Sequence, residues 1–145
     1  MNGLLELREK LENQEKVAYG IARQKLTTEE ERLHGLEAQK ISYELRYRNL
    51  CQSKLNIVEI KQVQVAIENK KNQIKEQKIK VQNAEKSLEV ARIKLNQAMK
   101  DRKTIEILKE NAFEQFKKDL ESAEQKEIDE LVSFVYNTPA GYEED

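Results

Sequence analysis

The sequence predicts an all-α protein in which two long helices form an antiparallel coiled-coil hairpin with an overhanging C-terminal arm. Three observations support this fold class: a sustained heptad repeat, a composition suited to exposed helices, and a short segment where one apolar rhythm ends and another begins. Of the 145 residues, 37% are charged, only four are Gly and one is Pro, and the mean hydropathy is -0.86. Such a composition with helical periodicity favours long exposed helices over a compact core.

The strongest signal is a seven-residue repeat in the second half of the chain. Steps of three and four residues reach Ile60, Val63, Ile67, Lys70, Ile74, Gln77, Val81, Ala84, Leu88, Ala91, Leu95, Ala98, Arg102 and Ile105. Eleven of these fourteen positions are apolar, and no Pro or Gly interrupts the stretch. A repeat of this kind is typical of a coiled-coil helix, whose apolar seam is buried only against a second helix.

The first helix is expected over about residues 4–50. Its apolar spacing begins with an eleven-residue rhythm, which winds a helix pair less tightly than heptads do. This rhythm runs through Leu4, Leu7, Leu11, Ala18, Ala22, Leu26 and Leu33, with Glu15 and Glu29 at the remaining steps, and heptads follow from Leu33 onward. Gly20 interrupts the helix between two alanines, which favours a close approach of the partner helix; a flexible joint is the alternative.

The chain is expected to reverse at about residues 51–56, where the two rhythms meet. Ser53 and Asn56 are both good N-cap residues for a second helix over about residues 57–136. The polar stretch at residues 69–72 is a weaker candidate, because the heptad phase passes through it unchanged. Residues 1–136 are therefore predicted to form one helical hairpin, and residues 137–145 a flexible tail.

The second helix is expected to overhang the first beyond about residue 105. The overhang is nevertheless rich in large apolar side chains, among them Leu108, Phe113, Phe116, Leu120, Ile128, Leu131, Val132, Phe134 and Val135. Because burial of each large apolar side chain contributes about 1.5–3 kcal/mol, an unpaired apolar face indicates a binding partner. Self-association or a fold-back onto the first helix is the alternative.

Charge is distributed unevenly, although the net charge is only -1. Residues 1–60 carry ten basic and ten acidic side chains, residues 61–103 carry twelve and five, and residues 104–145 carry four and twelve. A basic middle and an acidic end favour different partners for different segments. The basic run lacks interleaved aromatic residues and any recognition module, so an acidic protein is favoured over nucleic acid as its partner.

No constellation of residues indicates catalysis, and we predict neither an enzyme nor a bound cofactor or metal. His34 is the only His and Cys51 the only Cys, so a metal cluster, an internal disulfide and a Cys-His nucleophile all lack partners in the sequence. No apolar run approaches the roughly 20 residues that cross a bilayer, and the start of the chain is too acidic for a signal peptide. These features predict a soluble, cytosolic protein without direct membrane insertion.

An ordered set of residues resembles the FliJ family, the flagellar export stalk proteins. The set comprises residues 4–10, Tyr43, Tyr47, Arg48, Leu50, Ile74, Gln77, Ala84, Glu85, Arg92, Leu95, Ala98, Arg102, Lys103, Leu108 and residues 128–131. The resemblance covers nearly the whole chain. It implies a two-helix antiparallel coiled coil, similar to the central stalk of rotary ATPases, that binds the hexameric flagellar export ATPase, the cytoplasmic domain of the export gate and export chaperones. It also implies peripheral association with the inner face of the cell membrane through the export apparatus.

The resemblance further implies which residues bind these partners. The gate-binding residues would be Leu36, Lys40, Tyr43, Tyr47, Ala66, Lys70, Gln73 and Gln77; on the second helix the family more often has aromatic or apolar residues. With the apolar overhang, it suggests that the ATPase-binding residues are Leu4, Leu7, Leu11, Phe113, Phe116, Leu120, Ile128, Leu131 and Val135.

Three alternatives remain open from the sequence. Tyr43 and Tyr47 fall in the heptad phase of the first helix, so they could be seam aromatics instead of binding residues. The chain could be a chaperone of the prefoldin kind, although it shows no strand-like alternation. It could also be a structural homodimer that pairs two long helices between chains.

Overall fold

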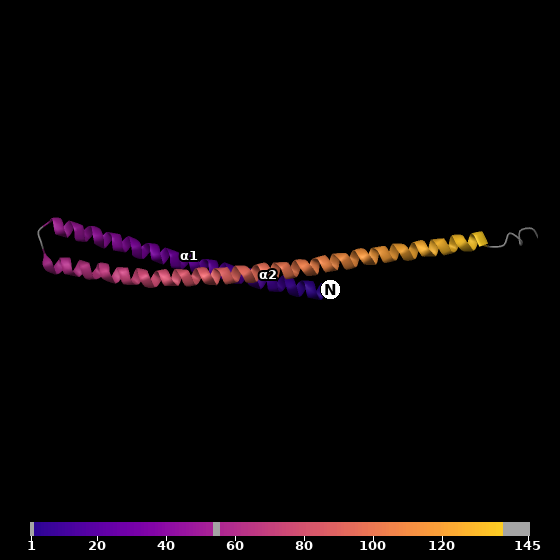
Figure 1. The fold of residues 1–145 in the computed structure, drawn as a ribbon, viewed down its shortest axis with the longest axis horizontal. Coiled ribbons are helices and arrows are strands. Elements are labelled where there is room, and N and C mark those ends of the chain that lie inside the picture. Colours follow the sequence, from indigo (N-terminus) through magenta and orange to yellow (C-terminus); the bar gives the residue numbers. More distant parts are fainter. Residues whose placement is uncertain (1, 54–55, 138–145) are drawn as a thin grey trace, which may run out of the picture. The chain divides into compact units, whose positions relative to one another are not determined.

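Two helices account for nearly all of the described chain. The computed structural model describes residues 2–53 and 56–137, of which only Ser53 and Asn56 lie outside helices. Helix α1 comprises Asn2–Gln52 and helix α2 comprises Ile57–Asn137 (Figure 1). No strand occurs within these residues. The predicted fold class is therefore confirmed: the protein is all-α, and its two long helices pack as an antiparallel coiled-coil hairpin.

Contacts divide the chain into two units. Unit 2 is Glu9–Lys100 and contains the antiparallel hairpin; unit 1 combines Met1–Arg8 with Asp101–Asp145. The expected single hairpin domain over residues 1–136 stays a prediction. The expected tail, residues 137–145, lies outside the described residues except for Asn137, which is the last residue of α2.

The seam predicted for α2 is confirmed at every position. In unit 2, Val63, Ile74, Gln77, Val81, Ala84 and Ala91 are buried, and Ile60, Ile67, Lys70, Leu88, Leu95 and Ala98 are half-buried. Arg102 and Ile105 are half-buried in unit 1. No described side chain is less than 2% exposed, because a pair of helices can cover a seam only from one side. The hairpin is therefore held by many thin layers and has no deep core.

The eleven-residue rhythm predicted for α1 is wrong at its start, although Glu15, Ala22, Leu26, Glu29 and Leu33 do lie in the seam. Leu4, Leu7, Leu11 and Ala18 are exposed, and the half-buried or buried positions instead follow steps of three and four. In order they are Leu5, Arg8, Glu12, Glu15, Tyr19, Ala22, Leu26, Glu29, Leu33, Leu36, Lys40, Tyr43, Tyr47 and Leu50, and Glu37 beside Leu36 is also half-buried. The physical reason is that α2 keeps a strict heptad, and two helices in one coiled coil must share a period. The leucines at the start of α1 therefore lie beside the seam.

The expected close approach at Gly20 is also wrong. A Cβ atom built on Gly20 would meet no atom within 4 Å, and Gly20 is exposed. The partner helix contacts the neighbouring heptad positions Tyr19 and Ala22 instead, which are half-buried.

The two helices are connected between Gln52 and Ile57. α1 ends at Gln52 and α2 begins at Ile57, while Lys54 and Leu55, in the middle of the expected turn, lie outside the described residues. Asn56 caps α2 as expected, since its side-chain Oδ1 accepts a hydrogen bond from the backbone N–H of Glu59 at 3.3 Å. The Glu59 carboxylate in turn forms an ion pair with Arg46 across the hairpin, at 3.3 Å.

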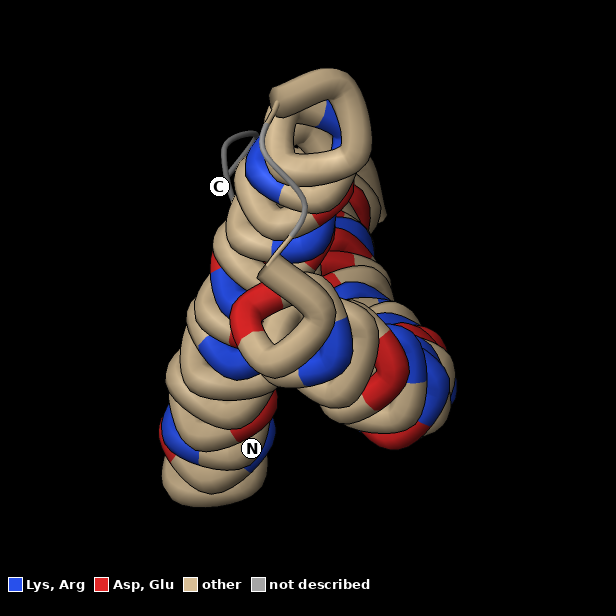
Figure 2. Tube along the Cα trace, turned by 90° about the vertical axis from the view of Figure 1, so that its left-hand side faces the viewer, with Lys and Arg blue, Asp and Glu red and all other residues tan. Residues whose placement is uncertain are grey.

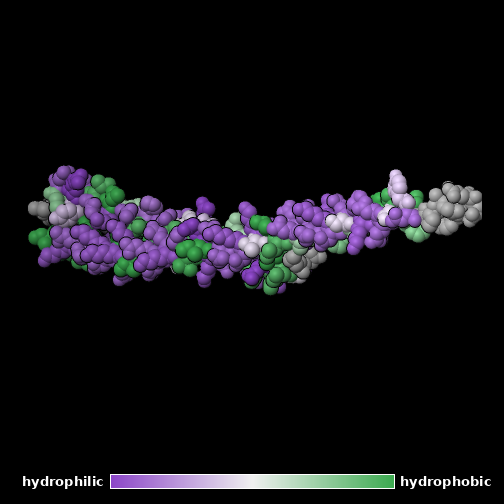
Figure 3. All heavy atoms as spheres, turned by 45° about the vertical axis from the view of Figure 1, so that its right-hand side comes forward, coloured by the Kyte–Doolittle hydropathy of each residue, from purple (hydrophilic) through white to green (hydrophobic). Residues whose placement is uncertain are grey.

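Charged side chains cover the surface outside the seam. Seen from the turn end, Lys and Arg (blue) and Asp and Glu (red) are interspersed on the helices (Figure 2). The space-filling view is mostly hydrophilic, with hydrophobic residues in separate patches (Figure 3). A coiled coil of this kind exposes much of each helix, so binding surfaces have to be sought among the exposed apolar and unbalanced charged residues.

A pair of isoleucines tests the seam. Ile74 is 8% exposed and Ile79, five residues further along α2, is 56% exposed. We expect Ile74→Ala to lower the free energy of unfolding by about 2 kcal/mol, and the control Ile79→Ala to change it by less than about 0.5 kcal/mol. Urea unfolding followed by circular dichroism measures both; equal losses for the two variants would contradict the assigned seam.

Candidate functional site

The residues predicted to bind the gate lie together in unit 2, along the part of the hairpin nearest the turn. We call them the tip residues: Leu36, Lys40, Tyr43, Tyr47, Ala66, Lys70, Gln73 and Gln77. Of these, only Gln73 is exposed; Gln77 is buried, and the other six are half-buried. The structure thus brings them together along the seam, with part of most side chains at the surface.

Tyr47 combines a seam position with a surface position. Its hydroxyl accepts a hydrogen bond from Gln64 Nε2 of the facing helix at 3.3 Å, and both groups are on the surface. A groove of about 320 Å³ beside it is lined by Tyr47, Gln64, Ile67, Glu68 and Lys71. The ring therefore occupies the seam while its hydroxyl stays at the surface, and a seam position does not remove this group from solvent.

Two lysines occupy seam positions close to these tyrosines. Lys40 forms an ion pair with Glu44 at 3.5 Å, and Lys70 donates a hydrogen bond to Gln73 Oε1 at 3.2 Å. Both partners lie on the same helix as the lysine. Each lysine stem covers the seam while its charged head reaches outward, so the seam near the turn carries positive charge at its edge.

A buried polar layer crosses the middle of unit 2. Gln77 is 3% exposed and Glu29 is 4% exposed, and they face each other from α2 and α1. The Gln77 side-chain amide donates to the Glu29 backbone carbonyl at 2.9 Å and to the Glu29 carboxylate. Because an alternative register would leave both buried groups unpaired, this layer favours one alignment of the two helices.

The same layer lowers the pKa of the Glu29 carboxyl group below its ordinary value. The largest cause is the hydrogen bond from Gln77, followed by the one from Lys25, whose Nζ lies 3.0 Å from Glu29 Oε1. A lowered pKa in the folded state stabilises the protein above the ordinary pKa of about 4.5, and this stabilisation is lost as the pH falls through the folded-state value.

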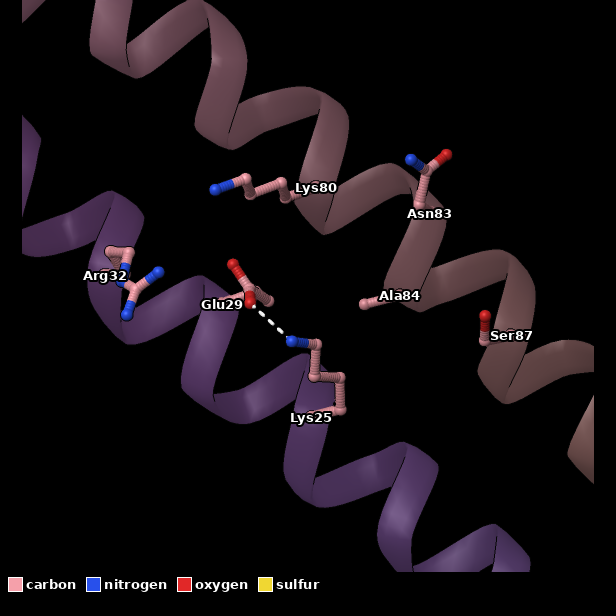
Figure 4. A pocket seen from close by; sticks show the side chains of 7 residues that line it. All are labelled: Lys25, Glu29, Arg32, Lys80, Asn83, Ala84 and Ser87. Carbon is pink, nitrogen blue, oxygen red and sulfur yellow. Dashed lines mark ion pairs between the residues drawn. The ribbon is translucent and has the colours of Figure 1, made fainter.

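Three cations surround this carboxylate in a groove that the sequence alone did not reveal. The groove, of about 350 Å³, is lined by Lys25, Glu29, Arg32, Lys80, Asn83, Ala84 and Ser87 (Figure 4). Lys25 and Arg32 come from α1, and Lys80 reaches from α2 toward them. In each helix these cations directly precede a seam position, namely Leu26, Leu33 and Val81. That adjacency was visible in the sequence, but the register that joins residue 25 to residue 80 was not.

The predicted ATPase-binding residues are exposed. In unit 1, α2 presents Phe113, Phe116, Leu120, Ile128, Leu131 and Val135, each at least 49% exposed, and α1 presents Leu4 and Leu7. Leu11, in unit 2, is 37% exposed. A groove of about 450 Å³ in unit 1 joins the start of α1 to α2, and is lined by Leu5, Glu106, Lys109, Glu110 and Phe113. From residue 107 to residue 137 every residue of α2 is exposed, so this apolar face is uncovered.

Other kinds of site find little support in the described residues. Among residues 2–53 and 56–137, no group of three or more His, Cys, Asp or Glu side chains could hold a metal ion. Cys51 is exposed, and His34 lies 3.8 Å from Glu37 on the same helix. Neither described helix is long and apolar enough to cross a membrane.

Comparison with known proteins identifies a protein family. A family model described as "Flagellar FliJ protein" matches residues 1–141 of the chain. No curated protein and no solved structure matches it.

Replacement of Gln77 tests the buried layer. Gln77→Met keeps the shape of the side chain but removes the donor, so we expect the pKa of Glu29 to rise and the variant to be less stable than the native protein at pH 7. The difference in stability should shrink as the pH falls below about 4.5, because Glu29 then becomes protonated in both proteins. Carboxyl NMR titration and thermal unfolding measure the two effects, with the exposed Gln73→Met as the matched control. A stability difference that stays constant from pH 7 to pH 3 would contradict the assigned role of the carboxylate.

Proposed function

Because the chain belongs to the flagellar FliJ protein family, and is thereby a component of the flagellar protein export apparatus, we propose that it is the stalk of that apparatus. In this role it binds the hexameric ring of the export ATPase through unit 1, binds the cytoplasmic domain of the export gate through the tip residues of unit 2, and escorts export chaperones. It acts without catalysing a reaction, in the cytoplasm, peripherally associated with the inner face of the cell membrane through the apparatus.

The observation that carries the ATPase assignment is the uncovered apolar face of α2 in unit 1. Phe113 and Phe116 are 59% and 62% exposed, and further large apolar side chains follow to Val135. Exposure of such an apolar face to water is unfavourable. Burial of each large side chain against a partner would stabilise the complex by about 1.5–3 kcal/mol. Aromatic side chains are also enriched among the residues that dominate binding energy.

The gate assignment is supported by chemistry at the tip residues. Tyr43 is half-buried, Tyr47 keeps its hydroxyl at the surface, and the groove beside Tyr47 is bordered by Lys71 and Glu68. Tyrosine supplies a large contact area at a low cost in conformational entropy, which suits a binding residue on a rigid helix. Gln77 contributes through the register of the helices, since its side chain is already bonded to Glu29.

The direct test of the proposal is ATPase turnover. Addition of the full chain to a purified flagellar export ATPase should raise the rate of ATP hydrolysis and the fraction of hexameric rings, measured by a coupled assay and by electron microscopy. Turnover that does not respond to a saturating amount of the chain would reject the stalk assignment.

Removal of the C-terminal part of α2 tests which segment acts on the ATPase. A chain cut after Lys109 lacks the exposed aromatic residues, so we expect turnover to return to that of the ATPase alone. The finer variant Phe113→Ser with Phe116→Ser should have the same direction of effect, because it removes two large apolar contacts. The control Val58→Ser with Val65→Ser changes two equally exposed apolar residues of unit 2 and should leave stimulation intact. A cut chain that still stimulates would exclude unit 1 as the ATPase-binding segment.

Replacement of the tyrosines tests the gate contact. Tyr43→Ala with Tyr47→Ala should weaken binding to the purified cytoplasmic domain of the gate by about tenfold or more, since two aromatic hot spots each contribute over about 1 kcal/mol. Isothermal titration calorimetry measures the affinity, and circular dichroism checks that helix content is kept. Tyr19→Ala, a half-buried tyrosine elsewhere on α1, is the control. Equal affinity for the double variant and the native chain would remove the tyrosines from the gate contact.

A further inference from the structure

We propose that the cationic groove of unit 2, lined by Lys25, Arg32 and Lys80, docks the acidic arm of a second copy of this chain. The arm is the segment of α2 over residues 104–137. Its carboxylate at Glu124 would enter the groove, and the apolar side chains on both sides of Glu124 would cover exposed apolar residues along the hairpin.

The groove has an excess of positive charge that its own residues do not balance. Glu29 is the only carboxylate in its lining, and its two oxygens are already bonded to Lys25 and to Gln77. Within the described chain, Arg32 and Lys80 have no ion pair or hydrogen bond through their side chains. Arg32 and Lys80 approach one groove from facing helices (Figure 4), and like charges that lie near each other repel. A further carboxylate would therefore be stabilised here.

The surroundings of the groove suit a third helix. Ala84 and Ser87 line it with small side chains, so another helix can approach closely. One turn from Lys25 along α1 lies Ile21, which is 66% exposed, and one turn from Ser87 along α2 lies Val90, which is 51% exposed. The groove thus has a cationic centre and apolar residues beside it.

The arm has the complementary pattern. Residues 104–137 contain nine acidic and four basic side chains. Phe116, Leu120, Glu124 and Ile128 follow one another at steps of four, which places them on one face of the helix. One carboxylate therefore lies in the middle of an apolar stripe, where burial requires a cation as its partner. The Leu120–Glu124 spacing on the arm equals the Ile21–Lys25 spacing beside the groove.

A second molecule is the source of the arm that these observations favour. The acidic arm and the cationic groove belong to the same sequence, so another copy of the chain carries the complementary charges. Helix α2 has no break between Lys100 and Asn137 at which its own arm could turn back. The stripe from Phe116 to Ile128 would span about 18 Å of helix, which belongs among small, transient interfaces. Because the same arm carries the proposed ATPase contact, pairing and ring binding would compete, and this last point rests on the proposed function.

The experiment measures self-association of the full chain without the ATPase, so its result is independent of the proposed function. Sedimentation velocity from about 5 to 200 μM should show a concentration-dependent shift to a larger species, weaker in 500 mM than in 50 mM NaCl because salt screens the charges. Lys80→Glu and Glu124→Lys should each weaken association by about fivefold, and the double variant should return to within about twofold of the native chain.

The control exchanges charges that the proposal leaves out. Lys75 is exposed elsewhere on α2, and Asp129 lies on the other side of the arm from Glu124, so Lys75→Glu and Asp129→Lys should not alter association beyond about twofold. Circular dichroism verifies helix content in every variant. A native chain that remains monomeric throughout the range, or a double variant that associates more weakly than either single variant, would overturn the proposal.

Discussion

The hairpin depends on one strip of contact between two helices of the same period. Because α2 repeats every seven residues, α1 has to present a residue to the seam at the same interval, whether or not its apolar side chains fall there. Glu12, Glu29 and Lys40 therefore occupy seam positions, while Leu4, Leu7 and Leu11 lie outside. The polar layer of Glu29 and Gln77 adds a second constraint, since these two buried groups satisfy each other in only one alignment.

This constraint explains how far the sequence could predict the fold. The seam of α2 was predicted residue by residue, because its apolar residues recur at regular steps of three and four. The polar residues of the seam, Lys70, Gln77 and Arg102, fall at the same steps. The seam of α1 was predicted at Glu15, Ala22, Leu26 and Glu29 and from Leu33 onward, but not at the start of the helix. There Leu4, Leu7 and Leu11 formed a more persuasive apolar pattern than the true seam, which includes Arg8 and Glu12. The pattern of one helix considered alone cannot outweigh a period that its partner imposes.

The candidate sites also differ in how far the sequence predicts them. The exposed aromatic face near Phe113 could be predicted, because a helix that outlasts its partner leaves its apolar side chains uncovered. The cationic groove could not, since it joins residues 25 and 80 and depends on the register of the helices. Likewise, the sequence placed Gln77 in the seam of α2 but did not reveal its bond to Glu29 of α1. Local pattern thus predicts a surface carried by one helix, whereas a surface shared by two helices requires their alignment.

Gly20 and Gly35 have a mechanical consequence. Both lie within α1 with open space around them, so neither a turn nor a tight contact calls for a missing side chain. Each costs the helix about 1 kcal/mol relative to Ala, whereas α2 contains neither Gly nor Pro over its whole length. Under a bending load the two helices therefore differ in stiffness. Helix α1 bends first, near residues 20 and 35, while α2 resists bending.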